Sequence, residues 1–531
     1  MNTCSTAKEG ACSRSATAHR RQPKRFDEPL AGRARCLSDV ACRFTAICCC
    51  ARRSWIPARR EDVLEADGVF SVIDQDRLWA SGTIRQLPDG DAIPPSAGSG
   101  GGRAAAGLLA KVTFALSVLA LTGLPGCHQS ITTGSGPIPQ RGYLWQRAWN
   151  PAVMAAVQEA GKHLDGLVII GAEILWNGST PETIRANIDW PTLENAEKPI
   201  ALALRVAPYP GPFAKEDFTA RYISNVARSL IADAAAHRLD VSEFQLDFDC
   251  AQKKLNGYSL WVQAVRTAVH PTRFVITTLP AWLKEPDFVP LVRLADGYVL
   301  QVHSVPVSPQ GGQSFLLDTN LARQWTKTAA GLGIPFSVAL PTYRCLAGYD
   351  TTGKLLGVAM DSVDLAWPPG TRTLEFFTDA DDTAELVNEW LSARPAELKE
   401  LIWYRIPVTT DQRNWRWPTL AAVMTGRKPT HKLQSIQRGN NPVDLSIKNI
   451  GEADKQVAVK LTVRWTDASL VAYDALPGWT VATEKDRAVF TRKEDIPTGL
   501  PPGGEHSVGW LRFDKVVNSE SVAEEFSPPR R

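Results

Sequence analysis

The sequence predicts an α/β protein that consists of a (β/α)8 TIM barrel followed by a small C-terminal β-sandwich. Three observations support this prediction: short apolar segments recur along the chain, helix-like segments separate them, and an alternating pattern begins after Arg427. The apolar segments are residues 143–146, 166–172, 200–206, 243–249, 273–278, 297–303, 336–340 and 401–406. Such runs are typical of strands that are buried on both faces, as in a parallel barrel. A doubly wound sheet would have a Gly-rich turn after its first strand, and this sequence has none.

The segments between the predicted strands show the period of a helix. Tyr258, Trp261 and Val265 fall on one stripe, and residues 379–391 begin with aspartates and continue into an apolar face. The connection over residues 175–198 contains no convincing helix, so we expect one irregular unit. Together these elements place the barrel over residues 140–428.

The C-terminal part has the pattern of antiparallel β-structure. Val443, Leu445 and Ile447 alternate with polar residues, and turn-forming sequences rich in Gly and Pro separate such segments. We therefore expect a β-sandwich over residues 432–515. Residues 516–531 are polar, and we expect a mobile tail there.

The distribution of charge argues against a nucleic-acid partner. The 531 residues carry a net charge of +3, but residues 1–127 carry +5 and residues 128–531 carry −2. A nucleic-acid-binding domain is normally basic. Sequences typical of phosphate-binding loops, zinc proteases and serine hydrolases are absent as well. We expect no cofactor and no metal, although Asp247, Asp249 and His303 are an alternative set of metal ligands.

Residues 106–127 resemble a bacterial export signal. Arg103 and Lys111 precede a 14-residue apolar run, and Leu-Pro-Gly-Cys then ends the segment at Cys127, as in a lipobox whose cysteine is lipidated. We therefore expect an exported protein, either periplasmic or held at a bacterial membrane only through a lipid on Cys127. Plain secretion and a buried apolar helix are the alternatives. Residues 1–105 are then a disordered or untranslated leader.

Acidic residues at the ends of predicted strands are the candidates for catalysis, because barrel enzymes carry their active sites at the C-terminal ends of their strands. Asp247 and Asp249 lie two residues apart, so both should point into the barrel and should differ in their affinity for a proton. Glu173 follows the second strand and is the candidate proton donor. The alternatives are structural carboxylates, which for Glu173 means an ion pair with Arg147 or Arg205.

Polar and aromatic residues at the other strand ends are the candidates for substrate binding. They are Trp145, Gln301, His303, Tyr343, Trp403 and Arg405. Aromatic faces in a polar cleft suit stacking on the C–H face of a sugar. For each aromatic residue the alternative is packing in the core, and for His303 it is a hydrogen-bonded structural role. Of Tyr404 and Arg405, only one can point inward.

The sequence Asp-Phe-Asp at residues 247–249 resembles part of the strand-four motif of the chitinase-like family 18 glycoside hydrolases. This resemblance implies that Asp247 and Asp249 orient an acetamido group of a substrate. The proton donor of that family falls on Ala251 and its first aspartate on Phe244, so the acid is missing from this motif.

A closer resemblance extends over residues 140–515. The sequences Leu-Asp-Phe-Asp-Cys, Val-Leu-Gln-Val-His, Leu-Pro-Thr-Tyr and Ile-Trp-Tyr-Arg-Ile-Pro, with the trailing sandwich, resemble the bacterial domain-of-unknown-function family 3142. That family is similar to sugar-cleaving barrels, which implies a carbohydrate as the partner. Three functions remain open: a glycoside hydrolase or transglycosylase, a barrel that binds glycans without cleaving them, and a structural lipoprotein of the envelope.

Overall fold

The computed structural model of the protein describes residues 69–70, 133–178, 180–214, 217–303, 305–306, 315–360, 367–456, 460–493 and 499–524. The expected leader (residues 1–105, apart from 69–70), the expected export signal (106–127) and its Cys127 lie outside the described residues. Within the described part of the chain, no helix is long and apolar enough to cross a membrane.

Eight parallel strands form a closed barrel, which confirms the predicted fold class. In order around the barrel they are β3 (Gln140–Leu144), β16 (Leu398–Tyr404), β11 (Phe336–Pro341), β9 (Gly297–Gln301), β8 (Arg273–Thr278), β7 (Val241–Phe248), β6 (Ile200–Val206) and β4 (Gly166–Asn177). The ring closes because β3 pairs with both β16 and β4. Each of the predicted segments overlaps one of these strands.

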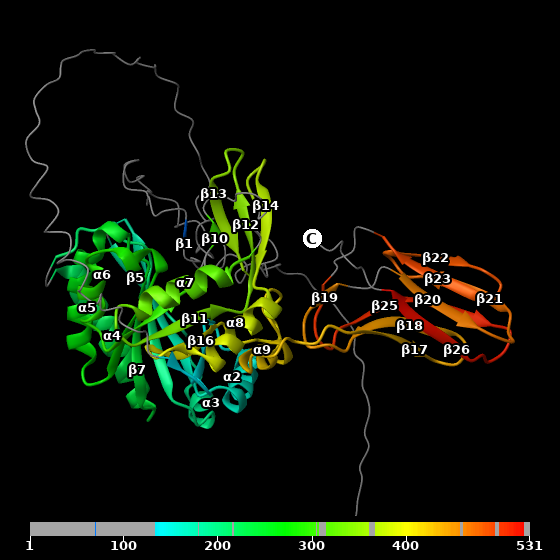
Figure 1. Ribbon diagram of the computed structural model, residues 1–531, viewed down its shortest axis with the longest axis horizontal. Coiled ribbons are helices and arrows are strands. Elements are labelled where there is room, and N and C mark those ends of the chain that lie inside the picture. The colour runs from blue at the N-terminus through cyan, green and yellow to red at the C-terminus, as the bar shows by residue number, and fades with distance from the viewer. Residues whose placement is uncertain are drawn as a thin grey trace, which may run out of the picture. The chain divides into compact units, whose positions relative to one another are not determined.

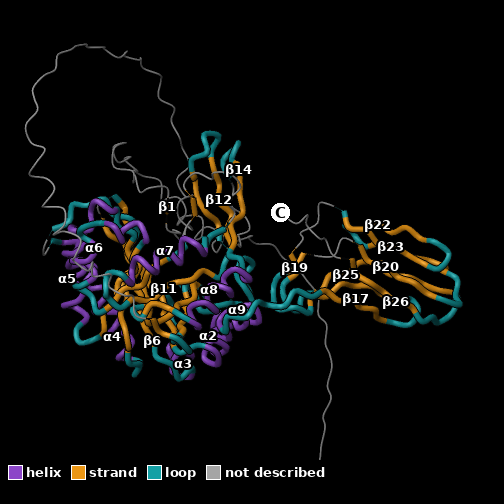
Figure 2. The backbone as a smooth tube through the Cα atoms, in the orientation of Figure 1, coloured by secondary structure: helices purple, strands orange, loops and turns teal. Residues whose placement is uncertain are grey.

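Helices cover the outside of the barrel (Figure 1, Figure 2). They are α2 (Pro151–His163), α3 (Trp190–Asn195), α4 (Phe218–Ala236), α5 (Leu255–Val269), α6 (Phe288–Val292), α7 (Thr319–Ala330), α8 (Ala380–Ser392) and α9 (Trp417–Met424), with 3-10 turns at Gln252–Lys254 and Pro280–Lys284. Several begin after an Asn or Asp whose side chain accepts a backbone N–H of the first turn, as at Asn150, Asp217 and Asp379. The irregular unit expected over residues 175–198 holds the short helix α3 and β5 (Thr180–Arg185), which pairs antiparallel with the end of β4.

Alternate residues of the barrel strands lie in two different environments. Outward-facing residues of β6, such as Leu202 and Leu204, pack in the main core with the helices. The inward-facing residues Ala201, Ala203 and Ala339 belong to a separate small cluster inside the barrel. Because these inward residues are small, the barrel axis has room for long polar side chains.

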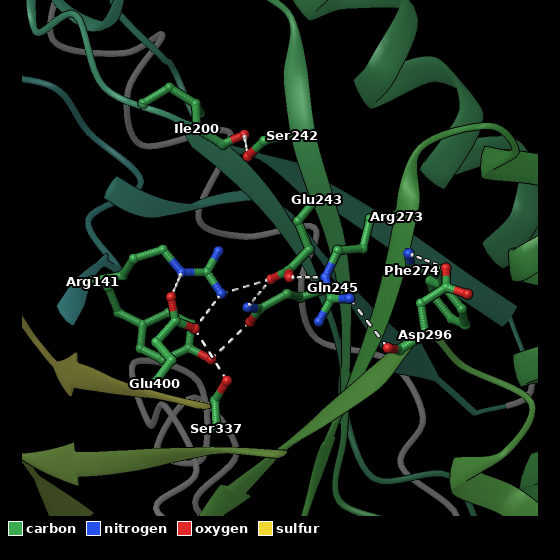
Figure 3. A network of polar contacts seen from close by, with 11 residues as sticks. Arg141, Ile200, Ser242, Glu243, Gln245, Arg273, Phe274, Asp296, Ser337 and Glu400 are labelled. Atoms are coloured by element: carbon green, nitrogen blue, oxygen red, sulfur yellow. Dashed lines mark hydrogen bonds and ion pairs between the residues drawn. The ribbon is translucent and has the colours of Figure 1, made fainter. Parts of the chain in front are cut away.

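A network of ion pairs fills the N-terminal end of the barrel interior (Figure 3). Glu243 on β7 accepts from Arg141 at 3.0 Å and from Arg273 at 2.9 Å, and Arg141 also pairs with Glu400 on β16 at 2.6 Å. Burial alone would raise the pKa of Glu243, but Arg141, Gln245 and Arg273 hold this pKa below its ordinary value. The network also fixes Gln245, whose amide donates to Glu243 at 2.8 Å.

A three-stranded antiparallel sheet lies between β11 and α8 in the sequence, and the sequence pattern does not predict it. Its strands, in the order β13, β12, β14, are Leu355–Ala359, Arg344–Tyr349 and Arg372–Phe377. A small core of this sheet includes Cys345, Ala347, Tyr349 and Phe376.

Two separate two-stranded sheets are also present in the described residues. One pairs β1 (Val69–Phe70) with β10 (Val305–Pro306), and the other pairs β2 (Thr133–Gly134) with β15 (Arg394–Pro395).

Antiparallel sheets form the predicted C-terminal sandwich. The strands of one sheet are, in order, β17 (Leu433–Arg438), β18 (Val443–Asn449), β25 (Glu505–Phe513) and β21 (Leu470–Ala475). The strands of the other sheet are, in order, β22 (Trp479–Thr483), β23 (Arg487–Arg492), β20 (Lys460–Trp465) and β26 (Ser519–Glu524). The strands β19 (Lys455–Gln456) and β24 (Gly499–Leu500) form a separate pair. The alternating residues Val443, Leu445 and Ile447 are buried in the core of the sandwich. The expectation of a mobile tail from residue 516 is wrong over β26, because this strand pairs with β20 along its whole length.

Candidate functional site

Three carboxylates surround one arginine at the C-terminal ends of neighbouring barrel strands. Glu173 lies on β4 and Arg205 on β6, while Asp247 and Asp249 lie at the end of β7. The guanidinium of Arg205 is 2.7 Å from Asp247 and 3.5 Å from Asp249, and its Nε is 3.6 Å from Glu173. The strand register produces this cluster, because Arg205 is the partner of Glu173 on one side and of Asp247 on the other.

Asp247 is the most firmly held carboxylate of the cluster. It accepts from Arg205, from the Thr277 hydroxyl at 2.6 Å and from the Gln301 amide at 3.2 Å. The residue is only 2% exposed. These hydrogen bonds fix the position of Asp247 at the floor of the barrel mouth.

The other two carboxylates differ in how their charge is compensated. Glu173 is paired with Arg147 at 3.1 Å as well as with Arg205, so the structural alternative considered for Glu173 is present. These two ion pairs occupy its carboxylate, which argues against Glu173 as the proton donor. The side chain of Asp249 is 12% exposed, against 5% for Glu173 and 3% for Asp247. Asp249 is therefore the carboxylate of the cluster with the best access to solvent.

Aromatic rings form a wall beside the cluster. Tyr143 and Trp145 pack edge to face with ring centroids 5.3 Å apart, and both contact Tyr404, at 5.7 and 5.4 Å. The imidazole of His303 stacks on Tyr404 at 5.8 Å. These rings enclose a cavity of about 20 Å³, which is also lined by Arg205, Asp247, Thr277, Gln301 and Ala339.

Two polar groups in this wall have no partner among the described residues. Nδ1 of His303 and the indole N–H of Trp145 are buried and make no hydrogen bond to any residue that the structure describes. Burial lowers the pKa of His303 to about 4, against the opposing effects of a hydrogen bond with the Ala339 backbone and the charge of Asp247. The imidazole is therefore neutral at pH 7. A buried polar atom without a partner costs about 1–3 kcal/mol, so such atoms are typical of places where water or a ligand binds.

A second aromatic group packs outside the barrel, in the core between the strands and the helices. Trp176 on β4 packs against Tyr209 with centroids 4.5 Å apart, and both rings contact Trp261 on α5, at 6.5 and 5.2 Å. The indole N–H of Trp176 donates to the Ala207 carbonyl at 3.0 Å. This group therefore belongs to the main core and does not line the cavity.

Most of this cluster comes from one stretch of the chain, between β6 and β16. Residues 198–409 match the family model of a domain of unknown function, DUF3142. The match confirms the resemblance to this family that the sequence shows. The DUF3142 region contains Arg205, Asp247, Asp249 and His303, whereas Glu173 precedes it.

The chain is also similar to several solved structures. The spore cortex-lytic enzyme SleL of Bacillus megaterium QM B1551 has 12% identity, with 56% of this chain and 75% of that chain covered and a TM-score of 0.40. The chitinase ChiA74 from Bacillus thuringiensis has 11% identity, with 73% of this chain and 100% of that chain covered and a TM-score of 0.34. A fungal endo-beta-N-acetylglucosaminidase from glycosyl hydrolase family 18 has 12% identity, with 54% of this chain and 96% of that chain covered and a TM-score of 0.33. No curated protein matches the chain.

Three of the predicted substrate-binding residues do not line the cavity of the barrel. Trp403 points outward and is fully buried in the main core with the helices. Arg405 pairs with Asp411 at 3.4 Å, and Tyr343 is buried in the core of the adjoining sheet. The expectation that these three side chains face the mouth is therefore corrected. Tyr404 is the inward-facing residue of this strand end, because alternate residues face opposite sides.

Five residues that line the cavity were not among the predicted site residues. They are Tyr143, Arg205, Thr277, Ala339 and Tyr404. A signal for Arg205 is present in the sequence, because it is the one charge in the apolar run 200–206 and a buried charge needs partners. Thr and Tyr are common in strands, so their presence in β3, β8 and β16 gives no comparable signal.

The charge arrangement does not suit a metal ion. Among the residues with a described position, no three His, Cys, Asp or Glu side chains come together as a metal site. Arg205 lies between Asp247 and Asp249, where a cation would have to bind. The cluster offers carboxylate acceptors, partly exposed aromatic faces and an isolated neutral imidazole. These groups suit a neutral ligand rich in hydroxyl groups.

Proposed function

We propose that this protein binds a poly- or oligosaccharide at the mouth of its barrel and cleaves or transfers a glycosidic bond there. The observation that supports this proposal most is the cluster of three carboxylates around Arg205, which lies beside aromatic rings. It is located at the end of the barrel where enzymes of this fold carry their active sites. Cleavage of a glycosidic bond needs a proton donor and a group that stabilises positive charge on the sugar.

Asp249 is the proposed proton donor. It has the most exposed side chain of the three carboxylates, so a substrate in the barrel mouth reaches it most easily. The sequence suggested Glu173 as the proton donor. In the structure Glu173 is paired with Arg147 and Arg205, so we assign to it the role of balancing the charge of these arginines.

Asp247 is the proposed stabiliser of the transition state. Its position is fixed by Arg205, Thr277 and Gln301, so it needs no rearrangement when positive charge develops on the sugar. Such preorganised charges give the largest contributions to catalysis in many enzymes.

A cleavage assay with the purified protein tests this proposal. Wild type is incubated with a panel of bacterial and plant polysaccharides, and released products are measured by chromatography. Asp249→Asn should lower the rate by at least ~100-fold, the usual minimum for a general acid. Asp233→Asn is the matched control, because Asp233 is an exposed carboxylate on α4 that is paired with Arg185. An Asp249→Asn variant that cleaves at the wild-type rate would exclude Asp249 as the donor.

The alternative function is a barrel that binds glycans without cleaving them. Ala251 occupies the position where the family 18 motif has its acid, and it directly precedes the 3-10 turn Gln252–Lys254. On this alternative, the wild-type protein binds a saccharide of the panel in a calorimetric titration but releases no product. Cleavage by wild type excludes it.

We further propose that the protein is exported and held at the envelope through a lipid on Cys127. The support is the apolar run that ends at this cysteine. Labelled palmitate should be incorporated into the wild-type protein and not into Cys127→Ser, and the variant should leave the membrane fraction. Equal membrane association of the two proteins would contradict the proposal.

A further inference from the structure

The cavity in the barrel mouth has the size of a single water molecule. Its volume is about 20 Å³, and about 10–15 Å³ is the least that holds one water. A sugar ring is far too large to enter it. The occupant must therefore be a water or one small polar group that reaches the floor of the mouth.

The lining of this cavity matches the hydrogen bonds of a water. Trp145 offers an N–H and His303 offers Nδ1, both buried and without a partner among the described residues. The hydroxyl of Tyr143 donates to Gln245 at 2.7 Å, so toward the cavity it can only accept. A water that accepts from Trp145 and donates to His303 and Tyr143 has the three hydrogen bonds that are typical of buried water.

We propose that this cavity holds the water that attacks the sugar, and that Nδ1 of His303 accepts its proton. The inference rests on the proposed function and adds the nucleophile and the base. The water oxygen forms a bond to the anomeric carbon while the bond from that carbon to the leaving oxygen breaks. One proton of the water moves to His303, and the leaving oxygen takes a proton from Asp249. A single displacement of this kind inverts the configuration at the anomeric carbon.

The surroundings of His303 support its role as a base. Burial keeps its pKa near 4, so the imidazole is neutral at pH 7. Nδ1 has no partner among the described residues, so the hydrogen bond with the Ala339 backbone involves the other ring nitrogen, which leaves the lone pair on Nδ1. The charge of Asp247 stabilises the imidazolium that forms when the proton arrives. Asp249 does not line the cavity, so the proposed acid and the proposed base are separate groups.

A crystal structure and a kinetic comparison test the inference. The wild-type structure should show a water within hydrogen-bond distance of His303 Nδ1 and Trp145 Nε1. His303→Phe keeps an aromatic ring against Tyr404 but has no acceptor, so it should lose the water and lower kcat by at least ~100-fold. Tyr298→Phe is the matched control and should keep both. Tyr298 lies on β9, the strand that precedes His303, and its hydroxyl is buried without a partner in the described structure but does not line the cavity. Proton NMR of the first product should show the inverted anomer.

The outcomes separate this inference from the proposed function. A wild-type enzyme that cleaves saccharides with retention, or whose cavity holds no water, overturns the inference alone. So does a His303→Phe variant with the kcat of wild type. A wild-type protein that cleaves nothing overturns the proposed function, and the role of the water with it, even where the water is seen.

Discussion

Replacing Arg205 by methionine should destabilise the folded protein strongly at neutral pH. The side chain of Arg205 is 7% exposed, and its guanidinium contacts Asp247, Asp249 and Glu173. Methionine has a similar volume but no charge, so the variant keeps the packing and removes the cation. Glu173 keeps Arg147 as a partner. Asp247 keeps only the neutral donors Thr277 and Gln301.

The expected loss is about 3–5 kcal/mol in the free energy of unfolding, the usual cost of removing one partner from a buried ion pair. Arg185→Met is the matched control, because Arg185 pairs with Asp233 on the surface, where both side chains are over 40% exposed. Exposed pairs contribute about 0–1 kcal/mol. The two variants should therefore differ by at least about 2 kcal/mol.

Urea unfolding at pH 7 provides the measurement. Adding Asp247→Asn to Arg205→Met should restore part of the stability at pH 7 and should show coupling in a double-mutant cycle. An Arg205→Met variant as stable at pH 7 as Arg185→Met would refute the assignment of a buried charge cluster.

Two further predictions concern the dependence of stability on pH. Burial lowers the pKa of His303 to about 4, so its contribution to the free energy of unfolding is full above about pH 6.5 and is lost as the pH falls toward 4. This contribution amounts to about 3 kcal/mol, and His303→Phe should flatten the urea stability profile in that window. Ion pairs lower the pKa of Glu243, so its contribution is present above about pH 4.3 and is lost below it. Glu243→Gln should therefore cost about 3 kcal/mol at pH 7 and flatten the acid limb of the same profile.

The sequence allows the barrel strands and part of the site to be predicted, because both depend on local periodicity. Two-residue spacing correctly brings Asp247 and Asp249 to the same arginine and places Gln301 and His303 together at the cavity. The aromatic candidate Trp145 lines the cavity as well. These residues follow apolar runs whose length and spacing are visible without any knowledge of the partner strands.

The remaining features depend on contacts between distant parts of the chain. Spacing shows that Trp403 and Arg405 face the side opposite to Tyr404, but it does not show which side is inward. The pairing of β16 with β3 and β11 decides this, and it turns Tyr404 inward. The pairing of Glu173 with Arg147 and Arg205 likewise requires the register between β4 and β6.

Strand β7 connects the charged floor of the barrel to its mouth. Glu243, Gln245, Asp247 and Asp249 occupy four successive inward positions, and none of them is apolar. The Gln245 amide donates to Glu243, which leaves its carbonyl oxygen to accept from the Tyr143 hydroxyl. The orientation of the Tyr143 hydroxyl therefore depends on a carboxylate at the opposite end of the barrel. Since that orientation makes the Tyr143 oxygen an acceptor toward the cavity, the ion pairs at the floor are part of the structure that positions the proposed water.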